Sequence, residues 1–251
     1  MNLETFCEDL HTLLESGPDV GRIIEEGRRL LAGLISDEAW FAGIIGRLHE
    51  DRTLFNEQKP SLWPNEITLC RRQDQSLLVN AYVWEPHAAD IVHDHGSWGL
   101  IGALINKIGE TKYERLDDGR TEGHAHLSES ASRVLEPGET TFVLPLDRGI
   151  HRMENRSDNV AITINVYGKS IHRGYVNFFY PEKRSVSRTY PPRTHKEVLL
   201  IRTLGSIGRP WATDILAKMM DRPLPDYIRE ECERSLSGND GGQASGVRKG
   251  S

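Results

Sequence analysis

The stretch His93-Asp94-His95-Gly96-Ser97-Trp98-Gly99 decides the fold prediction, because it places two histidines one residue apart after an apolar run over 81–92. On a β-strand, residues i and i+2 point to the same face, so His93 and His95 would direct both imidazoles to one point. His151 follows a second predicted strand, over 140–151, and would complete three corners of a metal site. Imidazole suits iron, copper, nickel and zinc, so the pattern predicts a metal without naming it.

The chain around these histidines, from about 60 to 183, is typical of short β-strands. Turn signals such as Glu136-Pro137-Gly138 and Ser157-Asp158-Asn159 separate apolar or β-branched runs. The predicted strands cover 77–84, 100–105, 112–115, 132–135, 140–144 and 161–167. Many short strands at this spacing indicate a sandwich or barrel, whose interior can hold a site.

Helical patterns lie on both sides of the strands, with apolar residues recurring at helical spacing. We predict an N-terminal helical segment over 1–57 that packs on the barrel, and a metal-binding domain over 58–190. A second helical segment is predicted over 194–237. The tail, 238–251, is rich in glycine and serine, and we expect it to be flexible.

Composition narrows the class of protein. The 251 residues carry a formal net charge of -6, with 37% hydrophobic and 27% charged residues, which fits a soluble globular chain without a nucleic-acid partner. No apolar run reaches membrane-spanning length, and the N-terminus lacks the pattern of a signal peptide. Cys7, Cys70 and Cys232 are far apart and form no CxxC pair, so we expect no disulfide framework and a cytoplasmic location.

The histidine pattern resembles the two sequence motifs of the cupin family, in the right order. His93-x-His95 is similar to the start of the first motif, and Gly138-x6-Pro145-x3-Gly149-x-His151-x3-Asn155 is similar to the second. The resemblance covers about half of the chain. It implies a mainly β protein built on a double-stranded β-helix, or jelly-roll, barrel, with N-terminal helices and a C-terminal helical appendage.

Most cupins carry a glutamate ligand a few residues after the paired histidines, whereas Trp98-Gly99-Leu100 holds no carboxylate here. In this the chain resembles the thiol dioxygenases, such as cysteine dioxygenase, and 83–86 with 93–99 look like the bacterial 3-mercaptopropionate group. The resemblance implies that His93, His95 and His151 hold Fe(II). It also implies that a substrate thiolate binds the iron and that dioxygen adds both atoms to sulfur, giving a sulfinate. Three histidines leave half of an octahedral iron open, and the thiolate supplies the charge of the missing glutamate.

A Ser-x-His-x-Tyr triad of that family aligns with Thr163-Ile164-Asn165-Val166-Tyr167. The first, third and fifth side chains alternate onto one face of a strand. The resemblance implies that Tyr167 hydrogen-bonds the bound oxygen or substrate, supported by Asn165 and Thr163. Asn165 donates and accepts hydrogen bonds but cannot titrate as histidine does, which leaves a different substrate, altered tuning or lost activity open.

An arginine holds the substrate carboxylate in that family, because its planar fork pairs bidentately with a carboxylate. Arg71 or Arg72 lies on the strand before 77, and Arg173 follows Tyr167, so the choice stays open. Each of them also fits a surface charge. Trp98 is expected to wall the pocket, to pack in the core, or both.

Two further patterns have less weight. His124-Ala125-His126 repeats the paired histidines within a polar stretch and without an evident third ligand, so we expect a solvated loop. The C-terminal helical segment, with 201–210 at its start, resembles one HEAT-type repeat. Such repeats are stable mainly in arrays, so this one would bury its apolar face on the barrel or on a protein partner.

The leading prediction is an Fe(II)-dependent dioxygenase that oxidises a small thiol, expected to bear a carboxylate, with O2. One alternative is another metal-dependent cupin enzyme. A second is a non-catalytic cupin that binds or senses a small molecule, with the C-terminal helices carrying a protein partner. No nucleic-acid or membrane partner is expected.

Overall fold

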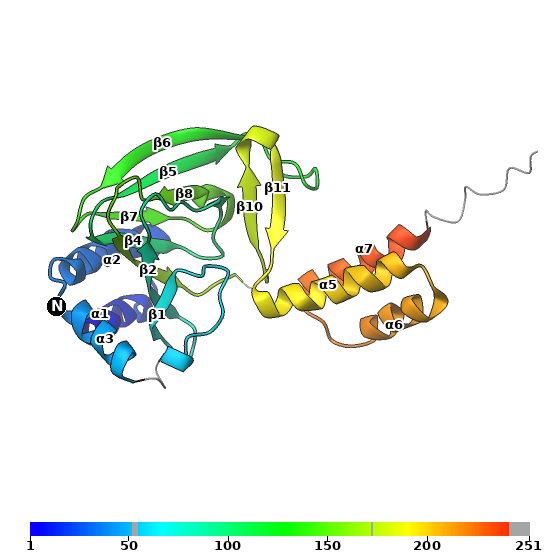
Figure 1. Ribbon diagram of the computed structural model, residues 1–251, viewed down its shortest axis with the longest axis horizontal. Coiled ribbons are helices and arrows are strands. Elements are labelled where there is room, and N and C mark those ends of the chain that lie inside the picture. Colours follow the sequence, from blue (N-terminus) through cyan, green and yellow to red (C-terminus); the bar gives the residue numbers. More distant parts are fainter. Residues whose placement is uncertain (52–54, 172, 241–251) are drawn as a thin grey trace, which may run out of the picture. The chain divides into compact units, whose positions relative to one another are not determined.

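The computed structural model describes residues 1–51, 55–171 and 173–240 (Figure 1). The chain forms two compact units. The first comprises 1–172 with 176–189, and the second comprises 173–175 with 190–251. The N-terminal helices and the strands therefore share one unit, and the C-terminal helices form the other. No described helix is long and apolar enough to cross a membrane.

Two antiparallel sheets form the barrel of the first unit. Sheet A has the strand order β1-β2-β9-β4-β7, and sheet B has the order β11-β10-β3-β8-β5-β6. The strands of sheet A are β1 (Glu66–Arg71), β2 (Leu77–Trp84), β4 (Gly99–Ile105), β7 (Thr140–Val143) and β9 (Ala161–Gly168). Those of sheet B are β3 (Val92–His93), β5 (Ile108–Arg115), β6 (Leu127–Leu135), β8 (His151–Glu154), β10 (Val176–Tyr180) and β11 (Ser185–Thr189).

The chain crosses from one sheet to the other at almost every connection between β2 and β10. This alternation is the strand arrangement of a double-stranded β-helix, or jelly roll. The predicted fold class, a mainly β barrel of this type with helices at both ends, is confirmed.

Three N-terminal helices pack on the outer face of sheet A: α1 (Leu3–Glu15), α2 (Val20–Ile35) and α3 (Ala39–Glu50) (Figure 1). Side chains of the helices, such as Phe6 and Leu31, share a hydrophobic cluster with Val79 of β2 and Val166 of β9. A Cβ added at Gly102 of β4 would lie 2.7 Å from Ile35 Cδ1, so glycine leaves room for the Ile35 side chain of helix α2 against the sheet.

A second cluster joins side chains of both sheets and fills the barrel interior. It includes Tyr82 and Trp84 of β2, Ile101 of β4 and Met153 of β8, with Tyr167 of β9 packed against it. The alternation of side chains along β2 and β9 thus sends one set to the helices and the next set into the barrel. The histidine site lies among this second set.

The second unit contains three helices, α5 (Pro192–Ile207), α6 (Pro210–Met220) and α7 (Asp226–Asp240). Val198, Ile201, Leu216 and Ile228 are buried between them. Gly208 ends α5 with a φ of +61°, a left-handed conformation that glycine adopts without strain. The likeness to a HEAT repeat stays a prediction, and the tail from 241 lies outside the described residues.

Candidate metal centre

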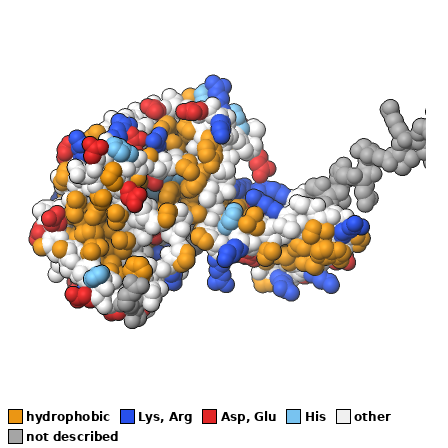
Figure 2. All heavy atoms as spheres, in the orientation of Figure 1, with side chains coloured by type: hydrophobic (Ala, Val, Ile, Leu, Met, Phe, Trp, Pro, Cys, Tyr) orange, Lys and Arg blue, Asp and Glu red, His pale blue; other side chains and the backbone are white. Residues whose placement is uncertain are grey.

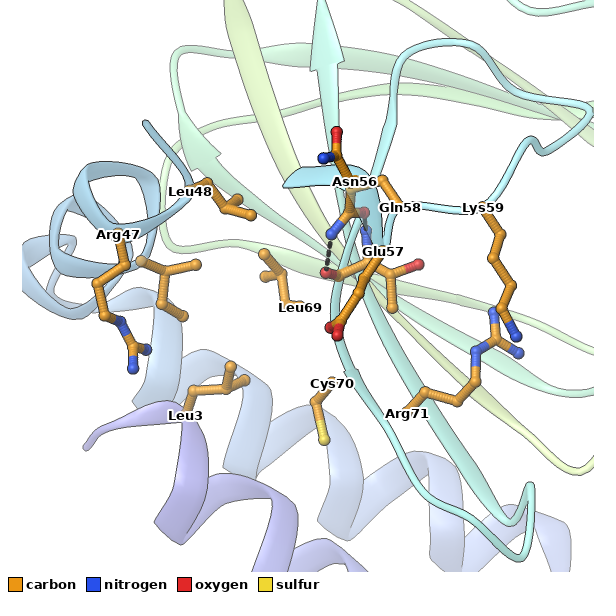
Figure 3. A pocket seen from close by; sticks show the side chains of 12 residues that line it. Leu3, Arg47, Leu48, Asn56, Glu57, Gln58, Lys59, Leu69, Cys70 and Arg71 are labelled. Carbon is orange, nitrogen blue, oxygen red and sulfur yellow. Dashed lines mark hydrogen bonds between the residues drawn. The ribbon is translucent and has the colours of Figure 1, made fainter. Parts of the chain in front are cut away.

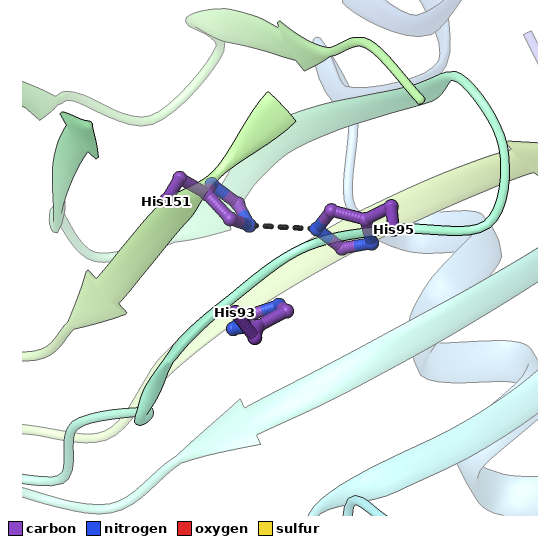
Figure 4. A group of neighbouring side chains, drawn as sticks. All are labelled: His93, His95 and His151. Carbon is purple, nitrogen blue, oxygen red and sulfur yellow. Dashed lines mark hydrogen bonds between the residues drawn. The ribbon is translucent and has the colours of Figure 1, made fainter. Parts of the chain in front are cut away.

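Three histidines meet inside the barrel (Figure 4). His93 ends β3 and pairs in register with His151, the first residue of β8. The ring centroids of His93, His95 and His151 are 4.7, 4.9 and 4.9 Å apart, so the rings form a nearly equilateral triangle. One ligand atom from each residue lies within 4.8 Å of the others. Among the described residues this is the group of His, Cys, Asp and Glu that could hold a metal ion.

The route by which His95 reaches the site differs from the prediction. The apolar run over 81–92 is broken after Trp84, and β3 contains only Val92 and His93, so His95 lies beyond the strand. Its position is fixed by anchors instead of strand pairing. The buried Asp94 carboxylate accepts hydrogen bonds from the Asn177 backbone N–H (3.0 Å) and side-chain amide (2.9 Å). The His95 carbonyl accepts from the backbone N–H of Leu146 at 2.8 Å.

Hydrogen bonds on the outer ring nitrogens orient two of the imidazoles. The Nδ1 of His93 donates to the Ile91 carbonyl at 2.8 Å, and the Nδ1 of His151 donates to the Glu110 carboxylate at 3.1 Å. Both rings therefore present Nε2 as the free lone pair, which is how metal-bound histidines are usually held.

The three rings suit a metal ion. Burial, with a smaller contribution from His151, lowers the pKa of His93 to about 3, so this imidazole is neutral near pH 7. The Nε2 atoms of His95 and His151 lie 2.9 Å apart. Two neutral lone pairs at that distance repel each other unless a proton or a cation is shared between them. The residues present thus fit a divalent metal that prefers nitrogen ligands.

Glu110 of β5 is a functional residue that the sequence analysis missed. Its side chain is fully buried and also accepts hydrogen bonds from the Thr141 hydroxyl (2.7 Å) and from Arg133 Nε (3.2 Å). Burial raises the pKa of this carboxyl, but the hydrogen bond and charge of His151 and the nearby Lys112 lower it further, so the pKa is depressed. The Glu110 carboxylate therefore hydrogen-bonds to the outer nitrogen of His151 and does not itself belong to the group that could bind the metal. Extending the predicted strand over 112–115 back to Ile108 would have placed Glu110 on an inward position.

The triad candidates lie on the inner face of β9. The Tyr167 ring stacks on His95, with centroids 5.5 Å apart and 25° between the planes. The Asn165 amide donates to the Tyr167 hydroxyl at 3.1 Å, and the Thr163 hydroxyl accepts from the Trp84 indole N–H at 3.1 Å. Burial raises the pKa of Tyr167 well above its ordinary value, so the phenol keeps its proton at neutral pH.

Asn80 of β2 faces Asn165 across the β2–β9 pairing and adds polar surface that the sequence analysis did not anticipate. Both side chains are buried. The Asn80 amide lies close enough to Tyr82 to lower the pKa of that phenol, which burial raises overall, yet neither Asn80 polar atom has a hydrogen bond of normal geometry within the described chain. The same holds for Asn165 Oδ1. Buried polar groups are normally paired, so this part of the interior is suited to a polar ligand.

The predicted carboxylate-binding arginines lie in different places. Arg71, at the end of β1, pairs with Leu78, which in turn pairs with Tyr167, so Arg71 lies on the Tyr167 side of sheet A. Its side chain is exposed and lines a surface pocket with Lys59 (Figure 3). Arg72 lines the neighbouring pocket against the N-terminal helices and lies 3.6 Å from Asp74. Within the described chain, no hydrogen bond or ion pair joins Arg71 or Arg72 to the three histidines.

Arg173 belongs to the second unit. There its Nε donates to the Tyr175 carbonyl at 3.0 Å, and its guanidinium lies 4.9 Å from the centre of the Tyr175 ring. Trp98 packs with the cluster between sheet A and the helices, and a Cβ added at Gly168 would lie 2.3 Å from its indole. The core-packing expectation for Trp98 therefore fits its position better than the pocket-wall expectation.

Two other residues pack beside the histidine site. The Trp63 ring lies 4.5 Å from the His93 ring, a contact with no signal in the sequence. Gly99 of β4 lies opposite Tyr167, and a Cβ there would come within 2.9 Å of the phenol ring. Glycine at the start of β4 thus leaves room for Tyr167 beside His95.

The second pair of histidines lies outside this site, as expected. His124 forms an isolated bridge with Ser185, and the backbone N–H of His126 donates to Asp117 at 2.6 Å. Neither joins a group of metal-ligating side chains in the described part of the chain.

No family model matches the chain. Solved structures with a similar fold include a cupin-like protein from Thermotoga maritima, 16% identical, covering 48% of this chain and 83% of that one with a TM-score of 0.34. A cupin 2 conserved barrel domain protein from Salinispora arenicola is 16% identical and covers 45% and 87%, with a TM-score of 0.31. A sugar phosphate isomerase from a cupin superfamily, from Silicibacter pomeroyi, is 16% identical and covers 51% and 78%, with a TM-score of 0.32.

The barrel is of the cupin type. This follows from the strand order and from the placement of His93 and His151 on the paired strands β3 and β8. Likenesses of this size carry no information about the reaction, which has to be argued from the residues in the cupin barrel.

Proposed function

We propose that this protein is an Fe(II)-dependent dioxygenase that oxidises a small thiol to a sulfinate. The observation that carries the proposal is the triangle of three histidine rings, without a carboxylate ligand, on which Tyr167 is stacked. In the net reaction, both atoms of O2 form bonds to the thiolate sulfur and the proton of the thiol is released. Iron(II), when bound, would supply the redox chemistry for O2 and open positions beside the three nitrogens.

The chain's own residues position and protect this chemistry. Glu110 holds the His151 ring in one orientation and in one tautomer. Tyr167, whose pKa is raised by burial, offers a hydroxyl proton as a hydrogen-bond donor next to His95. Trp63 covers the His93 ring and limits the access of water. Asn165 fixes the Tyr167 hydroxyl by a hydrogen bond, without a group that titrates near pH 7.

A carboxylate on the substrate would need a cation near the cavity. Arg71 is the candidate that its register position favours, because it shares the face of sheet A that carries Tyr167. Arg72 lines the pocket against the N-terminal helices, so of these two arginines we propose Arg71 for this role, with Arg173 as the alternative.

A non-catalytic binding protein with a helical partner segment is the second candidate. The observation that favours it is the apolar surface of α5 and α6, where Leu200 is 67% exposed and Trp211 is 53% exposed. Figure 2 shows hydrophobic side chains gathered on this helical unit. A protein partner could cover them whether or not the barrel is an enzyme.

Oxygen consumption by the iron-loaded protein tests the proposal. The full chain, loaded with Fe(II), should consume O2 with cysteine, 3-mercaptopropionate or cysteamine. Labelled dioxygen should place two labelled atoms in the sulfinate by mass spectrometry. Tyr167→Phe should lower kcat by about a hundredfold, the usual scale for losing a proton-donating group. Full iron occupancy without oxygen consumption across these thiols would refute the dioxygenase and favour the binding protein.

A further inference from the structure

Two cysteines that are far apart in the sequence meet between helix α1 and strand β1, away from the histidine site. Cys7 of α1 is buried, and Cys70 of β1 packs against the same hydrophobic cluster. Both line one pocket of about 670 Å³ under α1 and α3. Cys232 is buried in the second unit and belongs to its helical core.

A β-bulge brings Cys70 to Cys7. Thr68 pairs with Asn80, which points into the barrel, and strict alternation would send Cys70 to the same side. The register shifts between Thr68 and Cys70, so Cys70 pairs with Val79, whose side chain packs toward the helices. The extra residue therefore turns the Cys70 thiol out of the barrel and against α1.

Cys70 has the properties of a reactive thiol. The neighbouring Cys7 thiol, aided by the Arg72 charge, lowers the pKa of Cys70 below its ordinary value against the opposing effect of burial. A lowered pKa raises the fraction of thiolate, and the thiolate is the nucleophile. Cys70 is only partly buried and is also one of the residues that line a second pocket of about 610 Å³ (Figure 3). A small oxidant can therefore reach the sulfur.

We propose that Cys7 and Cys70 form a peroxide-oxidisable thiol pair, in which Cys70 is attacked first and Cys7 closes a disulfide. The Cys70 sulfur attacks one oxygen of hydrogen peroxide, the O–O bond breaks, and the departing hydroxide takes up a proton to become water. The Cys7 sulfur then attacks the sulfenic acid on Cys70, an S–S bond forms, and a second water leaves. Two thiols lose two electrons, and one peroxide is reduced to two waters.

The bond would tie α1 to β1 across a long loop of chain. Closing a long loop restricts the unfolded chain, so the oxidised protein should unfold at a higher temperature than the reduced one. The proposal is independent of the dioxygenase activity, because both cysteines pack between sheet A and the helices and the reaction requires no metal. It also differs from a structural disulfide framework, which the sequence argued against.

Mass spectrometry of the reduced full chain treated with one equivalent of hydrogen peroxide tests the proposal. Wild-type protein should lose two hydrogen atoms and yield a tryptic peptide pair linked through Cys7 and Cys70. Cys7→Ser should stop at the sulfenic acid, which dimedone traps on Cys70. Cys70→Ser should stay unmodified, and the matched control Cys232→Ser should behave like wild type.

Alkylation of the wild-type protein provides a readout that needs no variant. Iodoacetamide at pH 7 should label Cys70 at least about tenfold faster than Cys232, because burial raises the pKa of Cys232. Equal labelling rates, a linkage through Cys232, or rapid oxidation of Cys70→Ser would overturn the proposal.

Discussion

The two faces of sheet A differ in chemistry although the same strands build both. The face toward the helices is aliphatic, and its residues include Val79, Ala81, Ile164 and Val166. The face toward the barrel interior alternates with it and carries the polar groups of these strands; on β2 and β9 it includes Asn80, Tyr82, Thr163, Asn165 and Tyr167, beside Leu78, Trp84 and Ala161. Both faces are buried, so exposure to water does not explain the difference.

The difference indicates which face stabilises the fold and which serves the site. Burial of aliphatic groups contributes favourably in proportion to the area removed from water. Burial of an amide without a partner costs free energy, as for Asn80 and Asn165 Oδ1. Such a cost is retained where side chains meet a ligand, and here these amides lie beside Tyr167, which stacks on the histidine site. The comparison predicts that substitutions on the two faces separate stability from metal binding and activity.

The largest effect is expected from removing a metal ligand. His93→Ala should lose metal retention after purification, because two imidazoles cannot replace a triangular set of three. His124→Ala, from the second pair of histidines, is the matched control and should keep the metal content of wild type. Elemental analysis of both variants measures the difference. If His93→Ala and His124→Ala lost metal equally, the result would contradict the assignment of the metal to the first pair of histidines.

Truncating a side chain on the helix-facing side of sheet A should lower the stability of the protein and leave its metal content unchanged. Leu100 of β4 is fully buried against the helices, and Leu100→Ala should lower the free energy of unfolding by about 2–5 kcal/mol. Metal content per folded molecule should stay unchanged, since the side chain points away from the histidines. Urea unfolding with elemental analysis checks both quantities. Loss of metal from the folded variant would show that the two faces are coupled.

Glu110, on strand β5 of sheet B, tests the barrel interior with a smaller change than the loss of a histidine. Glu110→Gln keeps the shape of the side chain but weakens the acceptor for His151 Nδ1, so metal affinity should fall about 10–100-fold. Competition with a chelator of known affinity measures the change. Glu114→Gln, an exposed position on the same strand, should leave the affinity unchanged. A wild-type affinity in Glu110→Gln would mean that the carboxylate only fills space.

The sequence was informative where a local pattern carries the structure. The strand over 77–84 follows from alternation, and the three histidines, His93, His95 and His151, follow from motif spacing; the structure brings the three together. A longer strand over 108–115 could have placed Glu110 on an inward position, but its contact with His151 depends on the pairing of β5 with β8, which the pattern does not reveal.

Long-range strand pairing also explains why the sequence analysis assigned no role to two other residues, Asn80 and Cys70. Asn80 becomes a candidate only because strand β2 pairs with β9 and places it opposite Asn165. Cys70 meets Cys7 only because of a bulge, and one extra residue in a strand leaves no trace in a hydrophobic pattern. The position of His95 beyond the short β3 shows the same limit, since side-chain anchors replace the strand that alternation assumes.

The smallest effect sharpens the comparison most, because it should raise stability while harming function. Asn80→Leu replaces a buried amide without hydrogen bonds by an apolar side chain of similar size, and should stabilise the protein by about 1 kcal/mol. The same change should raise KM for the thiol, because the polar surface beside Asn165 is lost, while metal content remains that of wild type. Urea unfolding and oxygen consumption measure the two effects. A destabilised variant with unchanged KM would show that Asn80 belongs to the structural face, and that polar burial in this barrel does not mark the site.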